Sequence, residues 1–127
     1  MSDIKQLISI IIPVYNESES IGFLLDEVIN VMSFHEFNFE LIVVNDGSKD
    51  KTYQVLKELT LKIKELSVID LRKNYGQTAA MSAGFDNSKG DIIITLDGDL
   101  QNDPNDIPTL ISELNNGYDL ICGWRID

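Results

Sequence analysis

Hydrophobic residues alternate along this chain between two spacings, and this alternation restricts the fold more than any other feature. Short, β-branched and nearly continuous apolar runs, typical of strands buried on both faces, occupy residues 8–14, 39–44, 67–71, 91–96 and 118–122. Apolar residues at the spacing of an amphipathic helix occupy residues 21–32 and 50–65. Small residues that permit close packing of a helix on the sheet occupy 78–84, and a further helix is expected at 107–114. The alternation predicts right-handed βαβ crossovers, a mostly parallel sheet and therefore an α/β fold.

With 127 residues the chain is expected to form one domain, large enough for a core but small for a complete two-substrate enzyme. Its one cysteine, Cys122, excludes an internal disulfide. The N-terminus has no signal-type segment, and every apolar run is far shorter than the roughly 20 residues that span a bilayer. We therefore expect the chain as given to be cytoplasmic.

The formal charge of −11 argues against a nucleic-acid partner, which needs clustered Lys and Arg. It also means that an anionic substrate needs local positive charge, from a metal or from placed basic side chains. At about 4 Å and an effective dielectric constant near 20, a pair of unit charges interacts with about 4 kcal/mol. A diphosphate beside uncompensated carboxylates would thus be strongly repelled.

An acidic pair follows the expected strand at residues 91–96: Asp97 and Asp99 flank Gly98, and Gln101 comes two residues later. In a parallel α/β sheet, ligands bind at the carboxyl ends of the strands. Carboxylate and amide oxygens suit a hard divalent cation such as Mg²⁺ or Mn²⁺, and the glycine permits close approach of the backbone to a ligand. A solvated turn is the alternative interpretation.

Residues 13–17, Pro-Val-Tyr-Asn-Glu, follow the first strand without the glycine-rich turn of a dinucleotide-binding fold. This argues against a dehydrogenase of the Rossmann type. The ring of Tyr15, the amide of Asn16 and the carboxylate of Glu17 suit contacts with a base and a ribose. Alternatively, the segment is a proline-bounded turn that leads into a helix.

The second strand ends in Val44-Asn45-Asp46-Gly47-Ser48. In a functional interpretation, Asp46 accepts a hydrogen bond from a base N–H. In a structural one, the segment is a turn, and Ser48 or Asp50 caps the following helix.

Two arginines are candidates for phosphate or sugar contacts. Arg72 opens the Arg-Lys-Asn-Tyr-Gly segment after the third strand, which could equally be a solvated loop. Arg125 follows Gly123 and Trp124 after the last expected strand, where a guanidinium could clamp a phosphate.

Together, the segments at 13–17, 43–48 and 97–101 resemble those of family-2 glycosyltransferases with the GT-A fold, a Rossmann-like α/β/α sandwich. The segments at 72–76 and 123–125 favour the branch that includes dolichol-phosphate mannose synthase and bactoprenol glucosyltransferase. The resemblance implies inverting transfer of a hexose from UDP- or GDP-hexose to a polyprenyl phosphate, in cell-wall or glycan biosynthesis. It further implies that residues 1–127 are the nucleotide-sugar-binding N-terminal part, lacking the acceptor half and any membrane helices, of a protein at the cytoplasmic face of a membrane.

Roles for single residues come from the same resemblance. The donor nucleotide would be contacted by Pro13, Tyr15, Asn16, Glu17, Val44, Asp46, Ser48, Arg72, Gly98 and Arg125. The Mg²⁺ or Mn²⁺ ion and the diphosphate would be held by Asp97, Asp99 and Gln101. Relatives often have two acidic residues where this chain has Asn45 and Asp46.

Two other functions stay open. The chain could bind a nucleotide sugar without turning it over, as a part of a larger enzyme would. It could also be a metal-dependent phosphohydrolase with Asp97 as nucleophile, although that chemistry places its motif on the first strand and gives Gln101 no role. An uncovered sheet edge would also allow self-association.

Overall fold

The computed structural model describes residues 6–96 and 103–115 of the chain. In these residues strands and helices alternate as expected. The strands are β1 (Leu7–Val14), β2 (Asn38–Asp46), β3 (Leu66–Leu71) and β4 (Ile92–Thr95). The helices are α1 (Ile21–Phe34), α2 (Thr52–Thr60), α3 (Gln77–Asn87), the short 3₁₀ helix η1 (Pro104–Asp106) and α4 (Ile107–Asn115).

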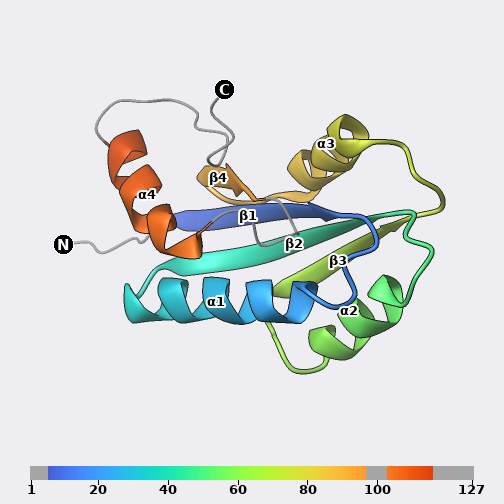
Figure 1. The fold of residues 1–127 in the computed structure, drawn as a ribbon. Helices are drawn as coiled ribbons and strands as arrows, with labels where there is room; N and C mark the ends of the chain where they lie inside the picture. The colour runs from blue at the N-terminus through green and yellow to red at the C-terminus, as the bar shows by residue number, and fades with distance from the viewer. Residues whose placement is uncertain (1–5, 97–102, 116–127) are drawn as a thin grey trace.

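The described strands form one sheet in the order β3-β2-β1-β4, and every pair in it is parallel. The central strand β1 pairs with β2 on one side and β4 on the other, so that Ile11 lies between Ile42 and Thr95. Because the strands run in the same direction, the loops that follow β1, β2 and β3 leave the sheet at one edge (Figure 1). The predicted parallel sheet is confirmed.

Helices cover both faces of this sheet, with α1, α2 and α4 on one side and α3 on the other (Figure 1). Successive residues of a strand point to opposite faces, so Ile10 and Ile12 join the larger core while Ile11 joins the smaller core under α3. Each fully buried aliphatic side chain of this kind stabilises the fold by about 1.5–3 kcal/mol. The layers are those of an α/β/α sandwich, as predicted.

Small residues let α3 approach the sheet closely, as its sequence indicates. Ala80 and Gly84 are buried against β1 and β2. A Cβ atom added to Gly84 would lie 2.4 Å from Cγ2 of Ile11, closer than such atoms can approach. The backbone of the helix therefore rests directly on the sheet.

The second helix is shorter than its pattern predicts: α2 ends at Thr60, not near residue 65, and Leu66 is the first residue of β3. After the helix the chain forms a tight turn, in which the backbone N–H of Leu61 donates to the carbonyl of Glu58, three residues earlier. Ile63 still packs against the larger core, but from the loop between α2 and β3. The strand pairing of Leu66 with Leu41 takes precedence over the helical spacing.

The expected strand at residues 118–122 lies outside the described residues. In the part of the chain that the structure describes, no helix combines the length and the apolar character needed to cross a membrane.

Candidate functional site

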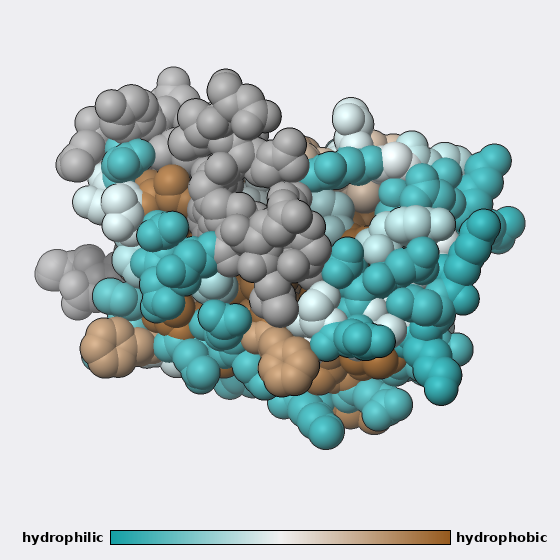
Figure 2. Space-filling model, in the orientation of Figure 1, coloured by the Kyte–Doolittle hydropathy of each residue, from teal (hydrophilic) through white to brown (hydrophobic). Residues whose placement is uncertain are grey.

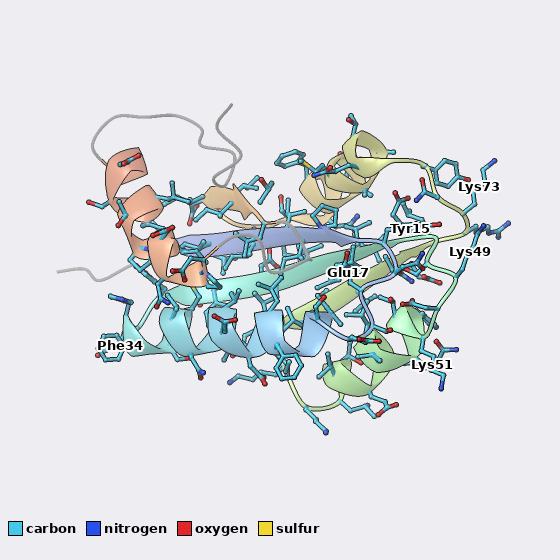
Figure 3. All side chains as sticks on the ribbon, viewed as in Figure 1. Tyr15, Glu17, Phe34, Lys49, Lys51 and Lys73 are labelled. Atoms are coloured by element: carbon cyan, nitrogen blue, oxygen red, sulfur yellow. The ribbon has the colours of Figure 1, made fainter. Side chains whose placement is uncertain are left out.

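The loops at the carboxyl edge of the sheet bring together segments that are far apart in the sequence. Figure 3 shows Tyr15, Lys49 and Lys73 at this end of the molecule, whereas Phe34 lies at the opposite end. The surface around these loops is predominantly hydrophilic (Figure 2). Hydrogen bonds between side chains and backbone join the loops into one unit.

Asn16 fastens the loop after β1 to the loop after β2. Its side-chain Oδ1 accepts from the backbone N–H of Lys49 at 2.8 Å and of Asp50 at 3.3 Å, while its own N–H donates to Ser48 Oγ at 2.9 Å. Its φ of +54° lies in the left-handed region, which asparagine tolerates better than most residues. Asn16 and Ser48, both predicted to contact the nucleotide, are thus also structural partners of each other.

Glu17 and Asp50 lie beside the starts of two helices. The carboxylate of Glu17 accepts from the hydroxyl of Ser20 at 2.9 Å, one residue before α1. Asp50 accepts from the backbone N–H of Thr52, the first residue of α2, at 2.9 Å, and from the N–H of Ser18 at 3.4 Å. The N-cap position of α2 is Lys51, whose side chain makes no capping bond; of the two predicted caps, Asp50, one residue earlier, is the one that accepts the first N–H of the helix.

The pKa of Asp50 is lowered from its usual value of 3.8. Partial desolvation acts to raise the pKa, but hydrogen bonds from Thr52 and Ser18 stabilise the carboxylate and outweigh it. Asp50 is therefore a charged cap over most of the pH range.

Asn45 is a buried bridge between β3 and the loop after β2. Its side-chain Nδ2 donates to Oδ1 of Asp70 at 2.8 Å, and its Oδ1 accepts from the hydroxyl of Ser48. Only 2% of its surface is exposed. An amide can donate on one side and accept on the other, which a carboxylate cannot do.

Asp46 holds the loop after β3. Its two carboxylate oxygens accept from the backbone N–H groups of Tyr75 at 2.8 Å and Gly76 at 3.0 Å, directly before α3. The side chain is 4% exposed. Next to it, Gly47 has a φ of +69°, and an added Cβ would lie 2.2 Å from the carbonyl carbon of Lys73.

A carboxylate of the chain thus lies beside the start of each of the described helices α1, α2 and α3: Glu17, Asp50 and Asp46, respectively. Helix N-termini attract anions because of their unpaired N–H groups and the helix dipole. Here they face anions that the protein itself supplies. A diphosphate bound at this edge needs its charge compensated by other groups.

Cationic side chains lie on the same loops. Lys49, Lys51, Arg72 and Lys73 are all exposed, and Nζ of Lys73 lies 5.2 Å from the centroid of the Tyr75 ring. Lys49 and Lys51 were not among the residues predicted from the sequence, although they follow the Asn45–Ser48 segment directly. Their position at the edge of the site makes them candidates for phosphate contacts (Figure 3).

A polar pocket of about 300 Å³ lies where the loop after β1 meets the loop after β2. Its lining residues are Asn16, Glu17, Ser18, Glu19, Ser20 and Asp50. Carboxylates and hydroxyls of this kind accept hydrogen bonds from ligand hydroxyl groups but repel phosphates. The pocket therefore suits a sugar ring better than a diphosphate.

Two residues predicted to contact substrate are buried or half-buried. Val44 is fully buried in the core under α3, so only its backbone can reach the edge of the site. Pro13 is half-buried as the second-last residue of the strand β1, one residue before the buried Val14 and two before the exposed Tyr15.

The predicted metal ligands Asp97, Asp99 and Gln101 lie outside the described residues, as do Gly98 and Arg125. The described chain reaches the carboxyl edge one residue earlier, where the N–H of Leu96 donates to the carbonyl of Ile11 at 2.9 Å. Among the residues that are described, no three His, Cys, Asp or Glu side chains are grouped so that they could hold a metal ion.

A parallel α/β sheet with polar loops joined at its carboxyl edge defines a class of protein that binds ligands at that edge. The sequence model described as Glycosyl transferase family 2 matches residues 9–127. The chain belongs to this family, as its motifs indicate.

The chain resembles curated proteins that are named for polyprenyl phosphates. The chain is 44% identical over 120 residues to the dodecaprenyl-phosphate galacturonate synthase of Rhizobium johnstonii, covering 93% of this chain and 36% of that protein. It is 41% identical over 130 residues to the undecaprenyl-phosphate 4-deoxy-4-formamido-L-arabinose transferase of Edwardsiella ictaluri, covering 100% of this chain and 40% of that protein. The chain thus spans well under half the length of these relatives.

Solved structures share the fold at low sequence identity. The mannosyltransferase PcManGT of Pyrobaculum calidifontis, in complex with GDP-Man and Mn²⁺, aligns with a TM-score of 0.70 and 22% identity over 81% of this chain and 30% of that one. The glucosyl-3-phosphoglycerate synthase of Mycobacterium tuberculosis, in complex with Mn²⁺, UDP and phosphoglyceric acid, aligns with a TM-score of 0.69 and 23% identity over 86% of this chain and 39% of that one. The fold is that of the GT-A glycosyltransferases.

Proposed function

We propose that this chain is the nucleotide-sugar-binding part of an inverting, metal-dependent hexosyltransferase. In this function, a hexose passes from UDP- or GDP-hexose to a polyprenyl phosphate. The observation that carries the proposal is that the segments around Asn16, Asp46 and Arg72 meet at one edge and are hydrogen-bonded into one unit. The names of the curated relatives support a polyprenyl-phosphate acceptor.

We assign the nucleoside and the phosphates of the donor to two different regions of the described residues. The pocket beside Glu17 and Asp50 offers acceptors to the hydroxyl groups of a sugar ring, such as the ribose. Tyr15 is partly exposed next to it, where its ring can stack on a base. Lys49, Arg72 and Lys73 lie on the neighbouring loops, where they can meet the phosphates.

A divalent cation is part of the proposal because the edge is acidic. The carboxylates of Asp97 and Asp99 and the amide oxygen of Gln101 form an all-oxygen donor set that fits Mg²⁺ or Mn²⁺. When bound, the ion would supply charge compensation for the leaving diphosphate. The N-termini of α1, α2 and α3 each lie beside a carboxylate of the chain, so compensation for a diphosphate would come from such an ion together with the exposed cations of the loops.

A phosphate acceptor also fits the chemistry that the chain offers. The acceptor oxygen of a lipid phosphate is already anionic at neutral pH, so the reaction needs no strong general base. In the longer relatives the remaining length would provide the acceptor site. We accordingly place the protein at the cytoplasmic face of a membrane.

A second candidate function is binding of the nucleotide sugar without turnover. The observation that favours it is that the described residues offer a polar pocket and exposed cations to a donor, whereas none of those residues is assigned a role toward an acceptor. Sugar transfer and binding alone differ in one measurement, the release of nucleoside diphosphate in the presence of a polyprenyl phosphate.

Calorimetry and thermal shift test the binding step. UDP, GDP and their sugars are titrated with and without Mn²⁺ into the wild type and into Asp99→Ala. One nucleotide is expected to stabilise the wild type only when metal is present, and the variant is expected to lose this effect. Metal-independent binding would contradict the proposal, and release of phosphate from a generic phosphoester would favour the phosphohydrolase.

A further inference from the structure

We propose that Thr52 is a positioning residue of the donor site, whose buried hydroxyl holds the backbone at Glu17 against the start of α2. The inference rests on the proposed function, because it assigns a further role within the same donor site. Thr52 is not one of the residues that line the polar pocket, so it acts through its neighbours there. Its hydroxyl thereby sets how well the pocket accepts the hydroxyl groups of the ribose.

The hydroxyl of Thr52 joins the loop after β1 to the loop after β2. Its Oγ1 accepts from the backbone N–H of Glu17 at 2.9 Å and donates to the carboxylate of Asp50. Thr52 is the first residue of α2, and 0% of its surface is exposed. Solvent therefore does not compete for these two hydrogen bonds.

Thr52 belongs to a set of three hydrogen bonds in which successive backbone N–H groups of one loop donate to side-chain oxygens of the other. The donors are Asn16, Glu17 and Ser18, and the acceptors are Ser48 at 2.9 Å, Thr52 at 2.9 Å and Asp50 at 3.4 Å, respectively. Ser48 is half-buried and Asp50 is exposed, so water can replace either of them as an acceptor. It cannot reach the position of the Thr52 hydroxyl, which makes Thr52 the critical member of the set.

The residues that Thr52 connects lie on different sides of the polar pocket. Glu17 and Ser18 line it from the loop after β1, and Asp50 lines it from the loop after β2. The two hydroxyl groups of a ribose need acceptors at a fixed separation, because hydrogen bonds weaken steeply with distance and angle. A displacement of one loop relative to the other therefore weakens recognition of the ribose before it affects the phosphates.

Two substitutions separate the hydroxyl of Thr52 from its methyl group. Thr52→Val keeps the branched shape but places a methyl group where Oγ1 lies, 2.9 Å from the backbone nitrogen of Glu17. This methyl group accepts no hydrogen bond and pushes the loop away. Thr52→Ser keeps the hydroxyl and removes only the methyl group, so it is expected to retain the contact.

Thr60, at the other end of α2, provides matched controls. Its hydroxyl donates to the carbonyl of Lys57 at 2.6 Å, within the same helix. Thr60→Val and Thr60→Ser make the same chemical changes without touching either loop of the site. Both are expected to behave as the wild type in the two measurements below.

The first measurement is amide hydrogen exchange of the 127-residue chain without any nucleotide. Thr52→Val is expected to lose protection at residues 16–18, whereas Thr52→Ser and both controls keep it. The amides of β1 and β2 report whether each variant is folded. If Thr52→Val does not fold, Thr52→Ala takes its place, because it removes the hydroxyl without adding a group beside Glu17. Unchanged protection at residues 16–18 in the folded variant would overturn the proposal.

The second measurement compares the Kd of UDP and GDP with that of their 2′-deoxy counterparts in the presence of Mn²⁺. The wild type is expected to prefer the ribonucleotide by about tenfold, as the loss of one hydrogen bond implies. In Thr52→Val the affinity for the ribonucleotide is expected to fall to that for the deoxyribonucleotide, which itself stays unchanged. Thr52→Ser is expected to restore the preference. A variant that was merely destabilised would bind both forms equally less.

Three results of this comparison would overturn the proposal. They are a wild type without preference for the ribonucleotide, a wild-type preference in Thr52→Val, and a loss in Thr52→Ser equal to that in Thr52→Val. If the wild type binds neither UDP nor GDP, the proposed function fails instead. The exchange experiment still decides in that case whether Thr52 holds the loop, because it contains no nucleotide.

Discussion

The side-chain amide of Asn45 donates to the carboxylate of Asp70 at 2.8 Å, across two neighbouring parallel strands. The same amide accepts from Ser48, which in turn accepts from the backbone N–H of Asn16. A neutral side chain at position 45 thereby links β3 to the loop after β1. An acidic side chain at position 45 would instead face the carboxylate of Asp70 without this hydrogen bond.

Asn45→Asp is expected to destabilise the fold by about 1 kcal/mol, because two carboxylates would then face each other and the exposed one is screened by solvent. Adding Asp70→Asn should restore most of the loss, since the amide and the carboxylate merely exchange places. Urea unfolding of both single variants and the double variant measures this coupling. Strictly additive effects would show that the two side chains do not interact.

The contact between Gly84 and Ile11 predicts a second effect on stability. Gly84→Ala should destabilise the fold by about 1–3 kcal/mol, because the methyl group would meet Cγ2 of Ile11 at 2.4 Å. Gly22→Ala in α1 is the matched control and should stabilise by about 0.5–1 kcal/mol, since alanine favours a helix and nothing lies within 4 Å. Thermal unfolding of the two variants distinguishes close packing from helix propensity.

Ser9 predicts a third effect, at the amino edge of the sheet. Its buried hydroxyl donates to Glu40 and accepts from the backbone N–H of Gly90 at 2.8 Å. Ser9→Ala should cost about 1 kcal/mol because it removes the acceptor of the half-buried N–H of Gly90 and the donor to Glu40. Nucleotide affinity should not change, since the site lies at the other edge, and parallel denaturation and titration experiments check both expectations.

The lowered pKa of Asp50 predicts a loss of stability in acid. A carboxylate whose pKa is lower in the folded state contributes stability above the unfolded value of 3.8, and this contribution disappears as the pH falls through the folded pKa. Thermal midpoints measured from about pH 6 down to pH 2 should therefore fall less steeply for Asp50→Asn than for the wild type. Equal slopes would show that the cap of α2 does not contribute.

The sheet could be predicted well from the sequence because each strand has a local apolar pattern. Ile10, Ile11 and Ile12 are apolar in succession, which only a strand covered on both faces accommodates. Because the strands are parallel, the segments that follow them necessarily lie at the same edge of the sheet. Family membership and the GT-A fold follow from the same segments.

Contacts between distant residues could not be read from local patterns. The end of α2 depends on where Leu66 pairs with Leu41, which the helical spacing does not encode. The hydrogen bonds of Asp46 join residues 29 and 30 positions apart. Turn chemistry and ligand chemistry use the same polar side chains, so the sequence did not reveal that Asn16 and Asp46, predicted to contact the nucleotide, also bond to the protein itself.

The cations on the loop at residues 72–76 provide a last prediction, on the phosphates. If Arg72 meets a phosphate of the donor, Arg72→Ala should weaken UDP by about tenfold, as loss of a charge-assisted hydrogen bond does, but leave uridine unchanged. Lys89→Ala removes an exposed cation next to the amino edge and serves as the matched control, with no expected change for either ligand. Competition titrations with uridine, UMP and UDP in Mn²⁺ show whether affinity is lost for the phosphates or for the nucleoside. An equal loss for uridine would show that Arg72 supports the nucleoside, and unchanged UDP affinity would leave the phosphates to Lys49, Lys73 and the metal.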